Sequence, residues 1–227
     1  MEKSDSHGVI RKIPKDASRV KHPVSLNSLI KTPPLGFRAP SLESRLQLAQ
    51  QLVASIYSFS VVRWLHKDFN SHNVFFFRDN STTSDIILDT PYVSGLSIAR
   101  PDNDQQKSLN KELDALSIYL HPDLRTSNPD QRPRYHRKYE FYSLGLGLLE
   151  IGGWRSIDML PGVNSSLDKV EFKRRVTDRA KKDLPFFMGK RYTEVVLYCL
   201  TCADGVDEST SALETLYECV VLELAKC

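Results

Sequence analysis

Apolar residues recur at helical spacing over five stretches of the chain: residues 41–59, 139–151, 167–182, 192–202 and 211–226. Because this spacing places apolar side chains on one face, each stretch is predicted to be a helix. Ser41 stands at the N-cap position of the first helix, and Gly152-Gly153 follows the second. The second helix is apolar nearly all round, which is typical of a helix buried in the core.

Short apolar runs between the first two helices are typical of strands, because polar residues bound them. We expect extended segments at residues 61–65, 74–77, 86–88 and 92–95. The polar residues 78–85 predict a hairpin loop, residues 100–115 a surface loop, and His121-Pro122-Asp123 a turn. The predicted fold class is therefore mainly α (α+β), with a small β-hairpin element.

Residues 1–40 differ in composition from the rest of the chain. They hold eight Lys/Arg, three Asp/Glu and the prolines Pro14, Pro23, Pro33, Pro34 and Pro40. Because apolar residues are few, this segment is predicted to be a basic, partly disordered leader with one helical turn around Leu26–Ile30. The folded domain is predicted to span residues 41–227.

The composition is that of a globular protein, with 41% hydrophobic and 26% charged residues in a chain of 227. A net charge of +3 gives no indication of nucleic acid or an anionic membrane as partner. The sequence has no apolar signal segment and no apolar run of about 20 residues, so we expect no membrane span. The cysteines are interpreted as reduced thiols of a cytoplasmic protein: Cys199, Cys202, Cys219 and Cys227. The Cys199-x-x-Cys202 pair is a weak zinc or redox signal, and we interpret it as two buried structural thiols.

The most specific chemistry lies in residues 66–73, which have the pattern His-x-Asp-x-x-x-x-Asn before an apolar run. An Asp followed five residues later by an Asn is how phosphoryl-transfer enzymes place a general base beside a Mg²⁺ ligand. Asp68 would deprotonate the attacking hydroxyl, and the side-chain oxygen of Asn73 would hold the metal. The alternative is structural: Asp68 holds the loop through hydrogen bonds to the backbone, and Asn73 caps the strand.

Weaker signals accompany this stretch. His66 and His72 have no third ligand nearby, so we expect His66 to pack beneath the loop and not to bind a metal. Ser108, in the polar surface loop, is a conceivable phosphorylation site. A run of basic residues is expected to be a solvated helix face, with contact to an acidic partner as the alternative: Arg174, Arg175, Arg179, Lys181 and Lys182.

The order of these motifs resembles the C-terminal lobe of a protein kinase. Residues 66–73 resemble the catalytic loop, with Lys67 in place of the usual Arg. Val93-Ser94-Gly95 stands where the metal-binding Asp-Phe-Gly is expected, and His121-Pro122-Asp123 resembles the Ala-Pro-Glu turn. Residues 140–145, Glu-Phe-Tyr-Ser-Leu-Gly, resemble the start of the central buried helix, with Glu in place of Asp.

The resemblance implies site roles for this loop. Asp68 would be the catalytic base, with His66 and Lys67 beside it, and Asn73 would bind Mg²⁺ with ATP as cofactor. The same spacing occurs in small-molecule phosphotransferases of the aminoglycoside-kinase type, but the Tyr-Ser-Leu-Gly helix and the His-Pro-Asp turn favour the protein-kinase branch.

Finer details resemble degenerate kinase-like domains of filamentous fungi. They are the Trp-Leu-His-Lys start of the loop, the Pro-Tyr-x-Ser-Gly segment and the Leu-Leu-Glu-Ile-Gly-x-Trp end of the buried helix. In that group such domains often follow a helical prion-inhibition-and-propagation (HeLo-type) domain linked to heterokaryon incompatibility and cell-death signalling. The resemblance covers about residues 41–225.

Parts of a kinase active site are missing from this sequence. Residues 1–40 contain Gly8 and Gly36 but no Gly-x-Gly-x-x-Gly, and they are too few for the five strands of an N-terminal lobe. No Val-Ala-x-Lys strand is present. Val93 stands where a carboxylate is needed, and a valine cannot coordinate a cation. We therefore expect the N-terminal lobe to be absent or vestigial in this chain.

These observations predict a pseudokinase-like signalling or interaction module without phosphotransfer activity and without a cofactor. It would contact protein partners, and no nucleic acid, through an apolar upper face near Phe75 and Tyr92. The alternative is an active or residual Ser/Thr-type protein kinase that uses Asp68 as base and Asn73 to hold Mg²⁺. A gene remnant with no stable role is the third interpretation.

Overall fold

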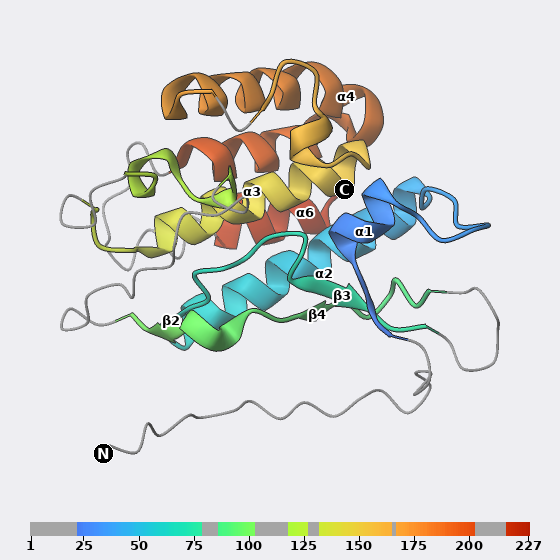
Figure 1. The fold of residues 1–227 in the computed structure, drawn as a ribbon, viewed down its shortest axis with the longest axis horizontal. Helices are drawn as coiled ribbons and strands as arrows, with labels where there is room; N and C mark the ends of the chain where they lie inside the picture. Colours follow the sequence, from blue (N-terminus) through green and yellow to red (C-terminus); the bar gives the residue numbers. More distant parts are fainter. Residues whose placement is uncertain (1–21, 79–85, 103–117, 127–131, 165–166, 203–216) are drawn as a thin grey trace.

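The computed structural model describes residues 22–78, 86–102, 118–126, 132–164, 167–202 and 217–227 (Figure 1). The helices are α1 (Leu26–Lys31), α2 (Leu42–Val61), α3 (Arg137–Gly153), α4 (Lys169–Thr201) and α6 (Glu223–Ala225). The strands are β1 (Val24–Ser25), β2 (Trp64–Leu65), β3 (Val74–Phe76), β4 (Tyr92–Val93) and β5 (Arg100–Pro101). Short 3₁₀ turns cover Leu96–Ile98, Pro122–Leu124 and Ile157–Met159, and a π-helical turn, Tyr217–Leu222, leads into α6. The predicted α+β class is confirmed.

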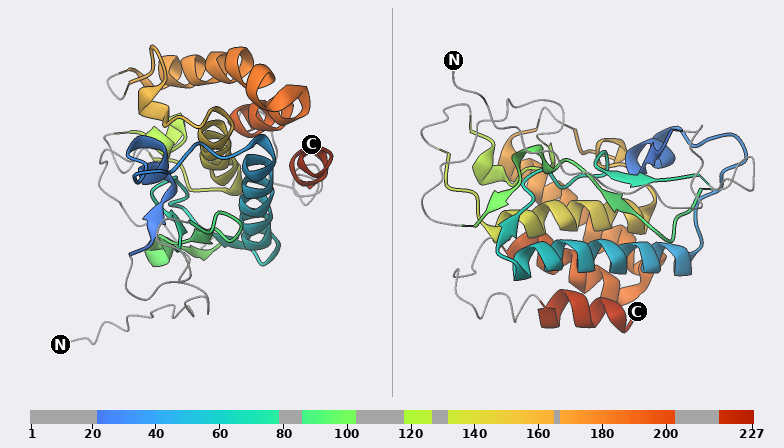
Figure 2. Two further views of the ribbon diagram at one scale, coloured as in Figure 1. Left: turned by 90° about the vertical axis from the view of Figure 1, so that its right-hand side faces the viewer. Right: turned by 90° about the horizontal axis from the view of Figure 1, so that it is seen from below.

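Helix α3 is the central element of the core. Figures 1 and 2 show it between α2 on one side and α4 on the other, and it contacts both. Every residue from Tyr139 to Gly152 is buried, as expected for a helix that is apolar on nearly all sides. Helix α2 begins where predicted, because the Ser41 hydroxyl accepts a hydrogen bond from the Ser44 N–H at 3.1 Å.

Two glycines allow α3 and α4 to approach closely. A Cβ atom on Gly145 would lie 2.9 Å from the Cβ of Cys199, and one on Gly152 would lie 2.7 Å from the Cδ2 of Leu184. Both distances are shorter than van der Waals contact, so any side chain at these positions would push α4 away. The cost of glycine in a helix is thus offset by closer packing.

Helix α4 differs from the prediction of two separate helices at 167–182 and 192–202. Its first half continues past Pro185, because the buried Leu184 and Met188 extend the apolar stripe by one turn. Pro185 lies on the exposed face of the helix. A kink at Gly189, with φ of 80° and ψ of 174°, separates the two halves.

Two small antiparallel sheets cover the lower side of the helices in Figure 1. The first has the order β1-β3-β4, with Phe75 opposite both Ser25 and Tyr92, so the extended segments predicted at 74–77 and 92–95 pair with each other. The hairpin predicted around residues 78–85 is represented by a single bridge between Arg78 and Ile86, and residues 79–85 lie outside the described residues. The second sheet pairs β2 with β5. The extended segment predicted at 61–65 is shorter than expected, because α2 continues to Val61.

The expectation of an irregular leader up to residue 40 is corrected for residues 24–31. Strand β1 pairs with β3, and the predicted helical turn is present as α1. Leu26 and Leu29 are buried in the same hydrophobic core as α2 and α3. This segment therefore belongs to the folded core, while residues 1–21 lie outside the described residues, as do residues 211–216 of the predicted last helix.

The cysteines are free thiols, and Cys199 and Cys202 are buried as predicted. Cys219 is half-buried and Cys227 is exposed. No helix among the described residues combines the length and apolar character needed to cross a bilayer.

The close approach of α3 and α4 predicts different effects for two neighbouring substitutions. Gly152→Ala should lower the free energy of unfolding by about 1–3 kcal/mol, because the new methyl group collides with Leu184 and Tyr192. Gly153→Ala is the matched control, because no atom lies within 4 Å of the point that its new methyl group would occupy, and it should raise stability by up to about 1 kcal/mol. Urea unfolding measures both, and equal effects would contradict the proposed role of Gly152.

Candidate functional site

The candidate site is the loop His66–Asn73, which connects β2 to β3. His66 is completely buried, and its ring packs edge-on against Phe59 and Phe69 with centroids 5.7 and 6.2 Å away. Its Nδ1 accepts a hydrogen bond from the N–H of Asp68 at 3.2 Å. The imidazole is thus a packed part of the loop, as the absence of a third metal ligand in the sequence indicated.

The side chain of Glu140, from the first turn of α3, holds this loop to the central helix. Its Oε2 accepts the N–H of His66 at 3.0 Å, and its Oε1 accepts the N–H of Lys67 at 2.6 Å. Tyr135 donates a further hydrogen bond to the same carboxylate. Glu140 is only 2% exposed, and burial raises its pKa above the ordinary value despite these hydrogen bonds.

The same contacts stabilise an unusual backbone conformation. Lys67 has a φ of 68°, in the left-handed region that side chains rarely adopt. Such a residue costs of order 1–2 kcal/mol unless its surroundings hold it. Glu140 binds the N–H of Lys67 and the N–H of the preceding residue, His66. Helix α3 therefore fixes the backbone geometry of the loop at this point.

Asp68 and Asn73 lie five residues apart and meet through the backbone. The Asn73 Nδ2 donates to the carbonyl of Asp68 at 2.8 Å. Asn70 donates to that carbonyl at 2.9 Å and to the Asp68 carboxylate at 3.2 Å. The Asp68 carboxylate thus accepts a hydrogen bond from the side chain of Asn70, whereas the structural interpretation expected bonds to the backbone. The Asn73 side chain closes the loop through its bond to the Asp68 carbonyl. The catalytic roles of His66, Lys67, Asp68 and Asn73 stay a prediction.

The Val93-Ser94-Gly95 segment lies directly against Asn73. The Ser94 N–H donates to the carbonyl of Asn73 at 2.8 Å, and β3 pairs Val74 with Val93. Gly95 has a φ of 83°, and a Cβ there would lie 2.4 Å from the Asn73 Nδ2. Glycine is therefore required at this position both for the backbone conformation and for the space that the Asn73 amide fills.

The residues of the loop do not fit a bound Mg²⁺ ion. A hard cation needs several oxygen ligands, and carboxylates are the usual ones. Val93 presents an apolar side chain that packs in the core where a carboxylate would be needed, and Asn73 offers a single neutral oxygen, because its Nδ2 donates to the Asp68 carbonyl. Within the described ranges, no three His, Cys, Asp or Glu side chains gather in an arrangement that could hold a metal. No chemical step is therefore assigned to Mg-ATP here.

A second buried acid, Glu150, joins the other end of the loop to α3. Its Oε1 accepts hydrogen bonds from the Tyr119 hydroxyl at 2.7 Å and from the Ile157 N–H at 3.0 Å. Tyr119 also contacts the hydroxyl of Ser71 at 2.9 Å, and the Asn27 amide donates to Ser71 at 3.3 Å. Burial raises the pKa of Glu150 above the ordinary value.

A group of cationic side chains surrounds the Lys67 end of the loop. We call it the cationic cluster: Lys67, Arg100, Arg132, Arg134 and Arg137. Asp102 is the carboxylate that pairs with the cluster, 3.3 Å from Arg134 and 3.1 Å from Arg137. Arg100 is only 7% exposed, and its Nε and Nη2 atoms have no hydrogen-bond partner in the part of the chain that the structure describes.

Electrostatic repulsion within the cluster is visible at Lys67. Burial and then the charge of Arg100 lower the pKa of Lys67 to about 8, against the opposing effect of Glu140. The pKa of Arg100 is also lowered, mainly by burial and then by Arg134. A bound oxyanion would relieve this repulsion and would supply acceptors for the buried guanidinium of Arg100.

An apolar face lies where α2 ends beside β2 and β4. A hollow of about 570 Å³ there is lined by Ser55, Ser58, Phe59, Val62, Trp64, Pro91, Tyr92 and Val93. Val62 is 64% exposed and Trp64 42% exposed at its edge. The expected apolar face is therefore present, but the exposed side chains are Val62 and Trp64, whereas Phe75 and Tyr92 are half-buried.

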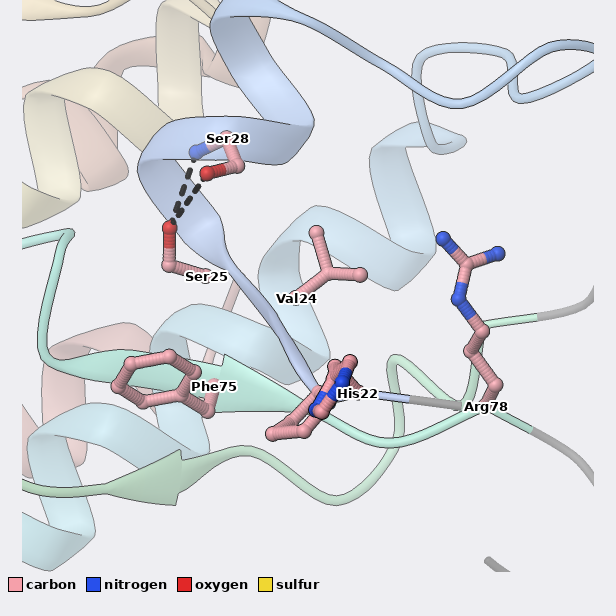
Figure 3. A pocket seen from close by; sticks show the side chains of 7 residues that line it. His22, Val24, Ser25, Ser28, Phe75 and Arg78 are labelled. Carbon is pink, nitrogen blue, oxygen red and sulfur yellow. Dashed lines mark hydrogen bonds between the residues drawn. The ribbon is translucent and has the colours of Figure 1, made fainter. Parts of the chain in front are cut away.

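A second hollow, of about 610 Å³, lies over Phe75 on the same sheet. Figure 3 shows Arg78 on one side of it and Ser25 with Ser28 on the other. The Ser25 hydroxyl is bonded to both the N–H and the hydroxyl of Ser28, so these polar groups cap α1. This hollow combines an aromatic floor with a cationic rim.

Sequence reasoning identified the loop residues but missed most of their neighbours. Glu140 was noted only as a replacement within a motif, and neither Glu150 nor the cationic cluster was predicted. No local pattern could reveal the cluster, because its members come from the loop, β5 and the segment before α3. The basic helix face is largely solvated, as expected, and Arg174 pairs there with Glu171 and Asp178. Ser108 lies outside the described residues.

The model of a family described as Domain of unknown function (DUF7580) matches residues 2–225, nearly the whole chain. No curated protein matches the sequence.

The two buried glutamates should respond oppositely to removal of their charge. Glu140→Gln should lower the free energy of unfolding by about 1–3 kcal/mol, because its amide nitrogen would face a backbone N–H and leave that donor unsatisfied. Glu150→Gln is the matched control. It should unfold less readily than the parent chain at neutral pH, because its remaining oxygen can accept both bonds now made to Oε1 while the buried charge is removed. Chemical denaturation of both variants tests this difference.

The Glu150 comparison also has a defined pH dependence. A carboxyl whose pKa is raised by folding stabilises most below its unfolded pKa and progressively less as the pH rises towards its folded pKa. The advantage of Glu150→Gln over the parent chain should therefore grow as the pH rises from about 4.5 and then become constant. A difference that does not change with pH would contradict the buried, raised pKa of Glu150.

Proposed function

The chain belongs to the DUF7580 family, and we propose that it is a non-catalytic signalling module with the fold of a protein kinase C-terminal lobe. We place it in the cytoplasm, in self/non-self or cell-death signalling of the fungal type. It acts through contacts with other molecules and not through phosphoryl transfer.

The kinase-like fold is supported by direct bonds between the motifs on which the resemblance depends. Residues 66–73 and Glu140 are far apart in sequence, yet two backbone N–H groups of the loop bind the Glu140 carboxylate. The Val93-Ser94-Gly95 segment lies against Asn73, as it would in that fold. The buried α3 provides the central helix.

One observation carries the non-catalytic part of the proposal: no carboxylate faces Asn73 from the Val93 position. Val93 packs in the core, and the Asn73 amide is bonded to the Asp68 carbonyl. Phosphoryl transfer depends on metal ions that neutralise charge on the phosphates. The alternative, an active or residual protein kinase with Asp68 as base and Asn73 as Mg²⁺ ligand, requires a metal ligand that these residues do not supply.

The partner surface of this module is the apolar face with its hollow of about 570 Å³. Exposed Val62 and Trp64 flank the hollow, and Tyr92 lines it. An exposed apolar patch with an aromatic anchor is typical of a protein-binding surface. Phe59 lines the hollow and also packs against the ring of His66, so the hollow adjoins the loop that Glu140 holds in place.

A second candidate function is oxyanion binding, and the buried guanidinium of Arg100 favours it. Two of its donors have no hydrogen-bond partner among the described residues, and within the same residues the cationic cluster outnumbers the carboxylates beside it, Asp102 and Glu140. Buried donors of this kind are normally satisfied, because an unsatisfied one is costly. A doubly charged oxyanion such as a phosphate monoester would satisfy them with bidentate geometry.

The non-catalytic proposal predicts no metal-dependent effect of ATP on stability. A ligand at ~100 times its dissociation constant stabilises the folded state by about 2.7 kcal/mol, which shifts the thermal midpoint visibly. We expect no shift with Mg-ATP for the parent chain. A shift that requires Mg²⁺ and is lost in both Asp68→Ala and Asn73→Ala would contradict the proposal and favour the active kinase.

Oxyanion binding predicts stabilisation by sulfate, whose charge is constant at neutral and alkaline pH. The thermal midpoint should rise with sulfate at pH 7, and the gain should fall above about pH 8, where Lys67 loses its proton. Arg100→Gln should remove the specific part of this gain. Arg174→Gln, on the exposed basic face, is the matched control for general salt effects, and equal behaviour of the two variants would exclude the site.

A further inference from the structure

A pair of exposed phenylalanines lies on α4, far from the loop His66–Asn73. Phe186 is 87% exposed, and Phe187 is also exposed beside it. The two rings are 5.3 Å apart and edge-on, so they contact each other. An exposed aromatic pair of this kind does not contribute to the core, and it indicates a surface that binds a protein or a membrane.

The outward direction of these rings follows from the packing of α4. Leu184 and Met188 lie one turn apart and are buried against α3, where both approach Gly152. Phe186 lies halfway between them in sequence, which places its side chain on the opposite face of the helix. Gly189 then interrupts the helix, so the pair sits at a bend.

Cations flank the aromatic pair on both sides. Lys181 and Lys182 are exposed one turn before it, and Lys190 follows directly after the bend. No ion pair involves Lys181 or Lys182 among the described residues, whereas Asp183 lies 3.8 Å from Arg179. Lys190 lies 3.7 Å from Glu194, and this ion pair is exposed to solvent, so it contributes little to stability. The surface around the rings is therefore positive.

We propose that this basic aromatic patch, formed by Lys181, Lys182, Phe186, Phe187 and Lys190, binds the anionic surface of a lipid bilayer. Lysines are depleted in protein–protein interfaces, whereas aromatic residues flanked by lysines are typical of segments that lie at a membrane surface. The rings enter the boundary between headgroups and acyl chains, and the ammonium groups remain at the level of the lipid phosphates.

This mode of binding leaves the rest of the molecule accessible. Figure 1 shows α4 as the outer helical layer, on the side of the core opposite the strands. The apolar face and the hollow over Phe75 lie among those strands. A chain held by α4 would therefore present the proposed partner surface away from the bilayer. The inference is independent of the proposed function and goes beyond it.

The test is co-sedimentation of the full chain with vesicles of phosphatidylcholine alone or mixed with phosphatidylserine. We expect binding to the mixed vesicles only, and loss of binding at high salt. Phe186→Ser should reduce the partition coefficient about tenfold or more. Lys181→Gln and Lys182→Gln should each reduce it about fivefold, as expected for one cation at an anionic surface. Val170→Ser is the matched control, because Val170 is 69% exposed on the same helix but outside the patch.

A thermal scan verifies that each variant is folded. Phe186→Trp provides a second measurement: brominated lipids should quench its fluorescence more strongly than that of the parent chain, which contains only Trp64 and Trp154. If the folded parent chain does not co-sediment with the mixed vesicles, the proposal is wrong. Binding that Phe186→Ser does not weaken, or a Phe186→Trp signal unaffected by brominated lipids, would also overturn it.

Discussion

The buried carboxylate of Glu140 is the interaction on which the arrangement of the loop depends. It satisfies two backbone N–H groups inside a core where water cannot replace it, and it does so beside a residue with positive φ. Burial of a carboxylate is costly, and these two bonds, the bond from Tyr135 and the charge of Lys67 offset that cost. The order of the loop is therefore determined by α3, which in turn is fixed by its close packing against α4 at Gly145 and Gly152.

The residues around Glu140 form two groups: one closes the loop through hydrogen bonds, and the other is the cationic cluster. Asn70, Asn73 and Gly95 close the loop on itself, so that its polar side chains are used for structure. Counted over the described part of the chain, the cationic cluster beside Lys67 has excess positive charge, and two donors of Arg100 have no partner. A site built in this way is suited to holding an anion and is poorly suited to the metal-dependent transfer of one, which is why binding is favoured over catalysis.

The sequence predicted those elements whose own pattern is strong. Helix α3 was recognisable because nearly every position is apolar, and the strands β3 and β4 because polar residues bound each of them. The helical turn of residues 26–30 was predicted, but the pairing of β1 and the burial of this segment in the core were not, because a two-residue strand is too short for periodicity to reveal. The helix predicted to end at residue 182 continues past Pro185, because Leu184 and Met188 are buried against the core. The cluster and the anchoring roles of Glu140 and Glu150 depend on contacts between distant segments, which no local pattern contains.

The most direct test of this account is amide hydrogen exchange at His66 and Lys67, followed by NMR in the parent chain at neutral pH. If Glu140 holds both N–H groups inside the core, their protection should be comparable to that of the buried amides in the middle of α3. Exchange as fast as at exposed positions such as Leu35 would contradict the account, because the loop would then open independently of the central helix.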